Sequence, residues 1–326
     1  LNLLLYLGLI GWAIRGFHRK DPVSFGILYF LATLSIVSNI LFPVGTHMSE
    51  RFVYMPSVGY ALVLAVLLYR LAQRRAPDGE LRTFRQLYPA LILAAGLVLA
   101  YGFRTVVRNP AWKNNYTLFS TDVVVSTSSA KLQNAMGGEL IAQATRPENE
   151  TQRAQLLQRA VGHLQRAVAI HPNYKNAHLL LGNAYYYLER WEQAIGSYQR
   201  ALQLDSGYEE AANNLAITYR DAGRFYGEQQ GDLARALQYL QQAYQLEPED
   251  YETLRLLGVA HGIQGNADRA LEFFSKAVER EPENPDALYN LGSAYYNAGM
   301  PEQGQAYHQR AREIDPEVEQ RMRGGD

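Results

Sequence analysis

Three long apolar runs in the first third of the chain constrain its fold more than any other feature. They span residues 23–42, 52–71 and 88–107, and a shorter apolar stretch, 1–12, precedes them. Crossing a membrane core of about 30 Å takes roughly 20 apolar helical residues, and each run is nearly free of charge until its end. Covering three such helices in water would need a much larger domain. We therefore expect about four membrane-spanning helices, the first of them truncated.

Charge divides the chain into two parts of opposite sign. Residues 1–124 contain 12 Lys and Arg against 5 Asp and Glu, whereas the remainder contains 19 against 27. The absence of cysteine excludes a disulfide framework, thiolate catalysis and cysteine-based zinc sites. The acidic second part argues against nucleic acid as a partner.

The basic residues between the apolar runs predict an orientation in the membrane. Eight Lys and Arg lie in the first and third connections, and four lie in the second connection and after the last run. Because basic connections remain in the cytoplasm, we expect everything after residue 108 to be extracytoplasmic. The chain is then an integral membrane protein of a bacterial inner membrane, or of the endoplasmic reticulum membrane if it is eukaryotic.

From residue 130 the sequence repeats with a period of 34. Phrases such as AVAIHP and AREIDP end at stop residues whose spacings are 34, 42, 34 and 34, namely Pro172, Ser206, Pro248, Pro282 and Pro316. Small residues recur at fixed places before each stop, as two closely packed helices require. This pattern resembles the tetratricopeptide repeat. The chain should be all-α, with a transmembrane helix bundle in 1–109, a linker in 110–129, an α-solenoid of five repeats in 130–319 and a tail in 320–326.

The first helices of the repeats are expected to line a concave groove. Their aromatic and amide side chains suit an extended polypeptide, and the predicted groove residues are Asn183, Tyr186, Tyr187, Asn213, Tyr289, Tyr296 and Asn297. Most other tyrosines should fill packing positions. Some members of the repeat family bind a C-terminal carboxylate through Lys, Asn or Arg, but the matching places of the fourth repeat carry Glu252 and Leu256. That clamp is not expected here. The longer spacing places an eight-residue insertion, 223–230, between the helices of the third repeat.

Two phrases beside the apolar runs are similar to a known enzyme family. SERFVYMPS (49–57) and RNPAWKNN (108–115), joined to the repeats, resemble the membrane-embedded protein O-mannosyltransferases that carry tetratricopeptide repeats, and their bacterial relatives. The resemblance implies a C-type glycosyltransferase fold and transfer of a mannose-type sugar from a polyprenyl-phosphate donor to protein. It also implies a catalytic acidic residue in an outer loop near the N-terminus of such enzymes. That loop is expected to be missing here, so no residue of this chain is predicted to be catalytic.

Charged residues near the outer ends of the apolar runs are candidates for contact with the lipid phosphate. They are Glu50, Arg51 and Arg104, since Arg binds phosphate in a bidentate manner. Interfacial anchoring explains them as well. His47 has no second ligand at metal-binding spacing, so no metal site is predicted. No cofactor is expected either, because glycine-rich phosphate loops and dinucleotide fingerprints are absent from the sequence.

Two functions remain open from the sequence. In the first, the chain is the C-terminal part of a membrane glycosyltransferase, and its extracytoplasmic repeats bind or present a protein acceptor. In the second, the spans anchor a non-catalytic repeat scaffold for protein–protein interaction. The sequence does not decide whether the longer protein to which the chain would belong, its parent, is an enzyme. The lipid bilayer is a partner under both functions.

Overall fold

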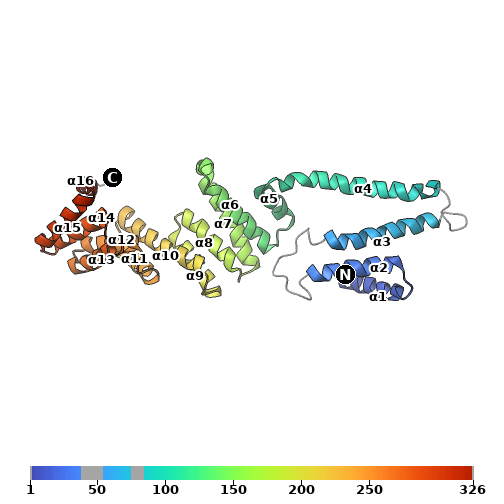
Figure 1. The fold of residues 1–326 in the computed structure, drawn as a ribbon, viewed down its shortest axis with the longest axis horizontal. Coiled ribbons are helices and arrows are strands. Elements are labelled where there is room, and N and C mark those ends of the chain that lie inside the picture. Colours follow the sequence, from blue (N-terminus) through green and yellow to red (C-terminus); the bar gives the residue numbers. More distant parts are fainter. Residues whose placement is uncertain (1, 38–53, 75–83, 325–326) are drawn as a thin grey trace. The chain divides into compact units, whose positions relative to one another are not determined.

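The computed structural model describes residues 2–37, 54–74 and 84–324, and all regular elements in these ranges are helical (Figure 1). The all-α prediction is confirmed. The chain divides into two compact units, Leu1–Pro110 and Ala111–Asp326, which are described separately below.

The described residues of the first unit form four long helices, α1 (Asn2–Phe17), α2 (Pro22–Val37), α3 (Tyr54–Gln73) and α4 (Tyr88–Arg108). The short 3₁₀ helix η2 (Phe84–Leu87) precedes α4. By length and composition, two helical segments of the described residues could cross a membrane, Tyr54–Gln73 and Arg85–Lys113, and the apolar part of α2 is shorter. The expected number of about four spans stays a prediction.

Helix α4 exposes large apolar side chains that a water-soluble helix would bury. Ile92, Leu99 and Phe103 are each more than 70% exposed. In contrast, α2 and α3 approach closely where both have glycine, because a Cβ on Gly59 would lie 2.6 Å from the carbonyl oxygen of Gly26. Close packing at small residues combined with exposed apolar faces is typical of helices in a lipid environment.

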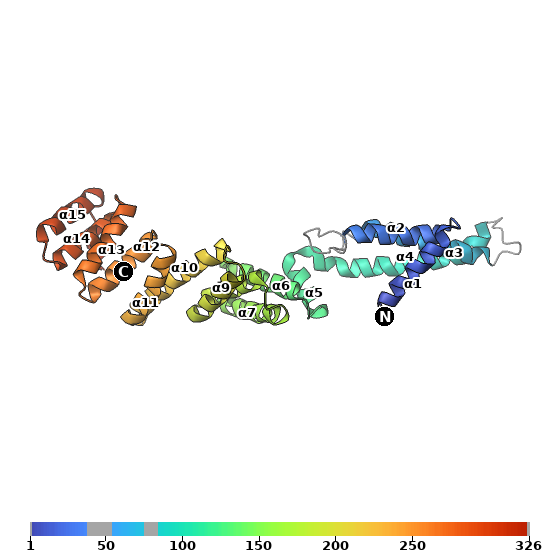
Figure 2. The ribbon, with the colours of Figure 1, turned by 90° about the horizontal axis from the view of Figure 1, so that it is seen from below.

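The second unit is a row of antiparallel helix pairs in which each pair stacks on the next (Figures 1 and 2). Its described residues form five such pairs: α6 (Ala130–Ala144) with α7 (Arg153–Ile170), α8 (Lys175–Tyr187) with α9 (Trp191–Leu204), α10 (Glu209–Arg224) with α11 (Leu233–Leu246), α12 (Tyr251–Ile263) with α13 (Ala267–Arg280), and α14 (Pro285–Asn297) with α15 (Pro301–Ile314). Five pairs are what the 34-residue period predicts.

Glycines on the first helix of a pair let the second helix come close. A Cβ on Gly182 would lie 2.5 Å from the ring of Tyr198, and one on Gly258 would lie 2.7 Å from the ring of Phe274. Both rings are buried, so they have little space in which to move. The lack of a side chain at these two glycines therefore allows the short distance between the paired helices.

The insertion in the third repeat lengthens a helix. Helix α10 continues into one π-helical turn, η5 (Phe225–Gln229), and the chain then reverses at Gly231, whose φ is +67°. The amide of Asp232 donates to the carbonyl of Tyr226 at 2.8 Å, which closes the turn. The first repeat has a similar polar connection, folded as the 3₁₀ helix η4 (Pro147–Gln152).

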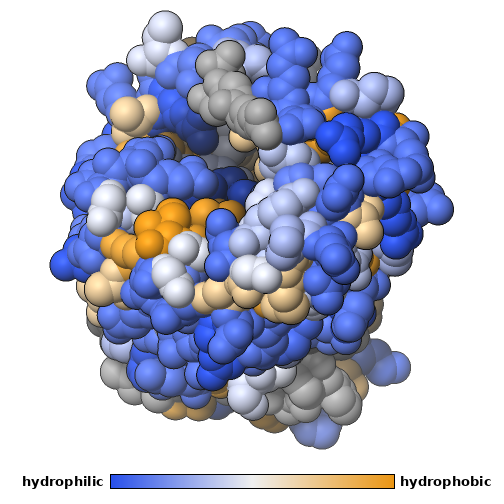
Figure 3. Space-filling model, turned by 90° about the vertical axis from the view of Figure 1, so that its left-hand side faces the viewer, coloured by the Kyte–Doolittle hydropathy of each residue, from blue (hydrophilic) through white to orange (hydrophobic). Residues whose placement is uncertain are grey.

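Short helices cover both ends of the repeat row. The residues expected to form a linker contain α5 (Asn115–Val125), which begins at a capping box between Asn114 and Thr117. Its residues Tyr116 and Phe119 pack on the core of the first repeats. At the other end α16 (Val318–Gly324) buries Val318 completely. Viewed from the side of the last repeat, the surface is mainly hydrophilic, with a hydrophobic area recessed in a hollow (Figure 3).

Replacing Gly182 with Ala tests the close packing of α8 and α9. The new methyl group would clash with the buried Tyr198 ring, and overpacking of this kind costs about 1–3 kcal/mol. Gly196→Ala on α9 is the matched control, because nothing lies within 4 Å of its Cβ position. That change should be neutral or stabilise the helix by up to about 1 kcal/mol. Urea unfolding followed by circular dichroism measures both, and equal stabilities would contradict the packing.

Candidate functional site in the repeat groove

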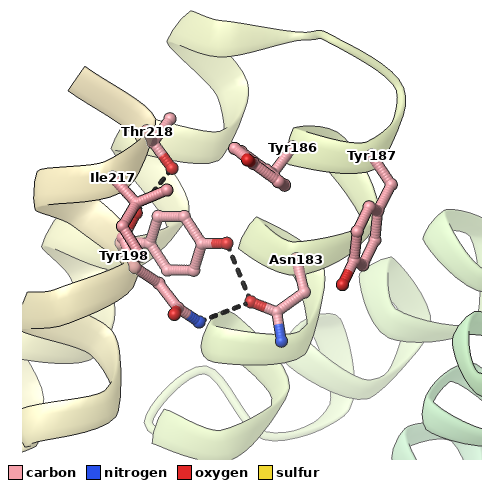
Figure 4. Close-up of a pocket in the computed structure, with 7 residues that line it drawn as sticks. Asn183, Tyr186, Tyr187, Tyr198, Ile217 and Thr218 are labelled. Carbon is pink, nitrogen blue, oxygen red and sulfur yellow. Dashed lines mark hydrogen bonds between the residues drawn. The ribbon is translucent and has the colours of Figure 1, made fainter. Parts of the chain in front are cut away.

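Three of the predicted groove residues lie together in one pocket. Asn183, Tyr186 and Tyr187 all come from the last two turns of α8. They line a pocket of about 200 Å³ whose remaining lining residues are Tyr198 from α9 and Asn214, Ile217 and Thr218 from α10 (Figure 4). The pocket therefore lies where the second repeat meets the third.

The amide of Asn183 is held in a fixed orientation. Its Oδ1 accepts a hydrogen bond from the hydroxyl of Tyr198 at 2.8 Å and another from Nδ2 of Asn214 at 3.0 Å. Burial raises the pKa of Tyr198, so its hydroxyl stays protonated and keeps donating. With the oxygen occupied, the Nδ2 group of Asn183 points away from both partners (Figure 4). It has no hydrogen-bond acceptor among the described residues.

Tyr186 connects the pocket to a network of charges. Its hydroxyl donates to Oδ2 of Asp221 at 2.6 Å, and burial followed by this hydrogen bond raises the pKa of Tyr186. Asp221 also accepts from Arg220 at 3.2 Å and from Arg224 at 3.0 Å. Arg220 lies 3.5 Å from Asp250 at the start of the fourth repeat. Both oxygens of the Asp221 carboxylate therefore accept hydrogen bonds from side chains of the protein itself.

Tyr187 forms the open wall of the pocket. It is 37% exposed, and its ring centroid lies 5.5 Å from that of Tyr186. The guanidinium of Arg153 lies 5.7 Å from the Tyr187 ring centroid, over its face. An exposed aromatic ring beside an oriented amide can pack on a ligand while the amide donates to it.

The other predicted groove residues lie elsewhere. Asn213 is exposed and lies outside the pocket, which its neighbour Asn214 lines in its place. Tyr289 is only 9% exposed and stacks on His308 with centroids 4.3 Å apart, so its ring belongs to the core of the last repeat. Tyr296 is 43% exposed on α14. Asn297 lines a separate pocket of about 510 Å³ with Asn290, between the fourth and fifth repeats.

The candidate lipid-phosphate residues are mostly outside the described part of the chain. Glu50 and Arg51 fall there, as does His47. Arg104 is described and is exposed on α4. Among the described residues there is no group of three or more His, Cys, Asp or Glu that could hold a metal ion.

Family models for the tetratricopeptide repeat match three overlapping parts of the second unit, residues 174–249, 228–285 and 263–323. The matched residues contain the helix pairs from α8 to α15. Residues 174–323 consist of tetratricopeptide repeats. One repeat type thus explains the recurring small residues and the paired helices of the second unit, which is called the tetratricopeptide-repeat unit below.

Curated relatives of the chain are protein O-mannosyl-transferases. The chain is 34% identical to Tmtc3 of Drosophila melanogaster over 167 residues, which cover 51% of this chain and 16% of that protein. It is 28% identical to human TMTC3 over 254 residues, or 75% of this chain and 26% of that protein. The chain therefore spans about a sixth to a quarter of these relatives. The longer match exceeds the tetratricopeptide-repeat unit, so the similarity extends into the apolar unit.

Solved structures of other proteins also align with the chain. YrrB, described as a tetratricopeptide-repeat protein with an unusual peptide-binding site, aligns at 22% identity with a TM-score of 0.41. The alignment covers 61% of this chain and 92% of YrrB. MamA aligns at 21% identity with a TM-score of 0.39, covering 56% of this chain and 96% of MamA.

Replacing Tyr186 with Phe tests the hydrogen bond to Asp221. A hydrogen bond to a charged group contributes about 1.5–3 kcal/mol, and partial exposure should reduce the loss to about 1–2 kcal/mol. Tyr187→Phe is the control, since no hydrogen bond of that hydroxyl is present in the described structure, and it should cost less than about 0.5 kcal/mol. Urea titration at neutral pH measures both values, and equal effects would contradict the role of the bond.

The raised pKa of Tyr186 also predicts a pH dependence. A tyrosine whose pKa is higher in the folded state contributes its full stabilisation below the unfolded value of about 10 and loses it as the pH rises further. The stability difference between the protein and Tyr186→Phe should therefore shrink in alkaline solution. A difference that grows with pH would have the wrong sign.

Proposed function

We propose that the tetratricopeptide repeats hold an extended polypeptide in the groove between the second and third repeats. The observation that carries the proposal is the oriented amide of Asn183, whose Nδ2 points away from its two protein partners. A main-chain carbonyl oxygen is the acceptor that such a donor suits. Peptides in extended conformation present carbonyls at regular intervals and leave side chains free to contact the walls.

The surroundings of Asn183 support a polypeptide ligand. The exposed ring of Tyr187 and the aliphatic side chain of Ile217 provide apolar contact beside the polar donor. The pocket, at about 200 Å³, is smaller than the usual range of about 300–1,000 Å³ for small-molecule sites. It suits one segment of a ligand that continues along the groove.

We further propose that the chain is the C-terminal part of a membrane glycosyltransferase-like protein. Residues 1–109 would be its last transmembrane helices, 130–319 its five repeats, and the polypeptide in the groove its acceptor. Similarity to protein O-mannosyl-transferases over three quarters of the chain supports this, as do two helices long enough to span. The parent would transfer a mannose-type sugar from a polyprenyl-phosphate donor, with Glu50, Arg51 and Arg104 near the lipid phosphate.

Replacing Asn183 with Asp tests the groove. The carboxylate keeps an oxygen that accepts from Tyr198 and Asn214, but it removes the donor and repels a peptide carbonyl. Binding of short synthetic peptides of random sequence, measured by fluorescence anisotropy with the whole chain in lipid nanodiscs, should weaken about tenfold or more. Thermal unfolding should change little.

Gln242→Leu is the control for this experiment. It removes an exposed amide from α11, outside the pocket, and should leave peptide binding unchanged. The proposal fails if Asn183→Asp binds the peptides as well as the original protein does, or if the original protein binds none of them.

The repeats are proposed to lie on the extracytoplasmic side, because eight basic residues lie in the connections assigned to the cytoplasm and four lie in the others. Protease added to the outside of spheroplasts from a bacterial expression host should therefore digest the repeats. Fragments detected by an antibody to the C-terminal helices provide the measurement. Full protection until the cells are lysed would reverse the orientation.

A further inference from the structure

A second pocket adjoins the groove pocket and shares two of its residues. It measures about 260 Å³ and lies at the turn between α8 and α9, against the π-helical turn of the third repeat. Tyr186 and Tyr187 line both pockets. The others lining this one are Arg153, Glu189, Trp191, Asp221, Arg224, Phe225, Glu228 and Gln229. A ligand in the groove can therefore extend a side chain into it.

Aromatic rings form the walls of the second pocket. Trp191 is 7% exposed, and its ring centroid lies 5.8 Å from that of Phe225 and 5.8 Å from that of Tyr186. Tyr187 completes the set at the shared edge. Flat aromatic walls favour a planar or cationic group over a bulky aliphatic one.

The positive charges at this pocket are engaged by the protein. Arg224 donates to Asp221 at 3.0 Å. Arg153 lies over the face of Tyr187 and pairs with the carboxylate of Glu150 at 3.9 Å. Of the three acidic residues lining the pocket, Asp221 is the one that these contacts neutralise. The pocket thus presents the negative charge of the other two.

Glu189 and Glu228 supply that negative charge. Within the described residues neither makes an ion pair at 4 Å or less, and both are exposed. The charge of Glu228 acts on Arg255 at longer range, but Arg255 already donates two hydrogen bonds to Glu252, at 2.8 and 2.7 Å. Two carboxylates beside aromatic walls match a cationic ligand group.

The backbone of Glu189 is unusual among the repeats. Its φ is +56°, and the residues at the same place in the fourth and fifth repeats are Gly265 and Gly299, with φ of +77° and +76°. All three turns have the same pattern, in which this residue's amide donates to the carbonyl three positions earlier. Side chains other than glycine are disfavoured at positive φ. In the second repeat this disfavoured backbone conformation is held by Glu189, which places a carboxylate at the pocket.

We propose that this pocket binds the guanidinium of an arginine side chain in the polypeptide that the groove holds. The planar cation would lie against the aromatic walls and donate to Glu189 and Glu228, in the bidentate geometry that carboxylates favour. The inference rests on the proposed function, since the shared residues Tyr186 and Tyr187 place the pocket beside the main chain held at Asn183. The pocket would give a preference for basic peptides to a groove that otherwise binds only the peptide main chain.

Four pools of synthetic peptides test the preference. The pools share random small residues and differ at one central position, which is Arg, Lys, the neutral isostere citrulline or Leu. With the whole chain in nanodiscs, fluorescence anisotropy should show the Arg pool binding about five- to tenfold more tightly than the citrulline pool. The advantage should fall at high salt. Equal binding of Arg and citrulline, or of Arg and Lys, would overturn the assignment.

Glu189→Gly separates binding from folding. It installs the residue found at the equivalent turns, so the melting temperature should stay the same or rise, while the advantage of Arg over citrulline falls to within about twofold. Glu189→Asp should retain part of the advantage. Glu302→Gln on α15, which also removes one exposed carboxylate, should retain all of it. An advantage that survives in the double variant Glu189→Gly with Glu228→Gln would contradict the proposal.

The two proposals fail in different ways. If no pool binds, or if Asn183→Asp leaves all pools unaffected, the groove function is wrong. If all four pools bind equally and Asn183→Asp weakens them all, the groove function holds and the arginine pocket is wrong.

Discussion

The close approach of paired helices at glycine is the contact on which the groove depends. Because Gly182 has no side chain, the ring of Tyr198 lies directly against α8, and its hydroxyl donates a hydrogen bond to Oδ1 of Asn183. The same ring is fully buried in the core of the repeats. Packing in the interior therefore fixes the direction of a donor at the surface, and a donor oriented in this way has little freedom left to lose.

The period and the small residues predict the fold well, since both follow from how two helices must pack. Asn183, Tyr186 and Tyr187, which the repeat pattern assigns to the groove, lie together in one pocket. Asn214 lines this pocket, whereas Asn213, one position earlier, lies about 100° away around α10. The packing of α10 on α9 decides which of the two faces the pocket. Tyr289 shows the same limit, because its stacking on His308 depends on a residue 19 positions later.

Features that involve the insertion could not be anticipated from the period. The extra residues predict a break between α10 and α11, but the chain widens its helix into a π turn that packs Phe225 on Trp191. Charges near it are equally non-local. Arg220 connects Asp221 in its own repeat to Asp250 in the next, and such pairings across repeats depend on the stacking angle. The sequence reports which charges exist, and stacking decides which remain unpaired.

The π turn of the third repeat has an evolutionary consequence. It absorbs additional residues while α10 and α11 still form a regular pair, so the stacking of neighbouring repeats is preserved. Mutations that lengthen, shorten or recompose this turn would alter one wall of the second pocket without disturbing the solenoid. The shape and charge of this pocket can therefore change while the stacked helix pairs stay the same.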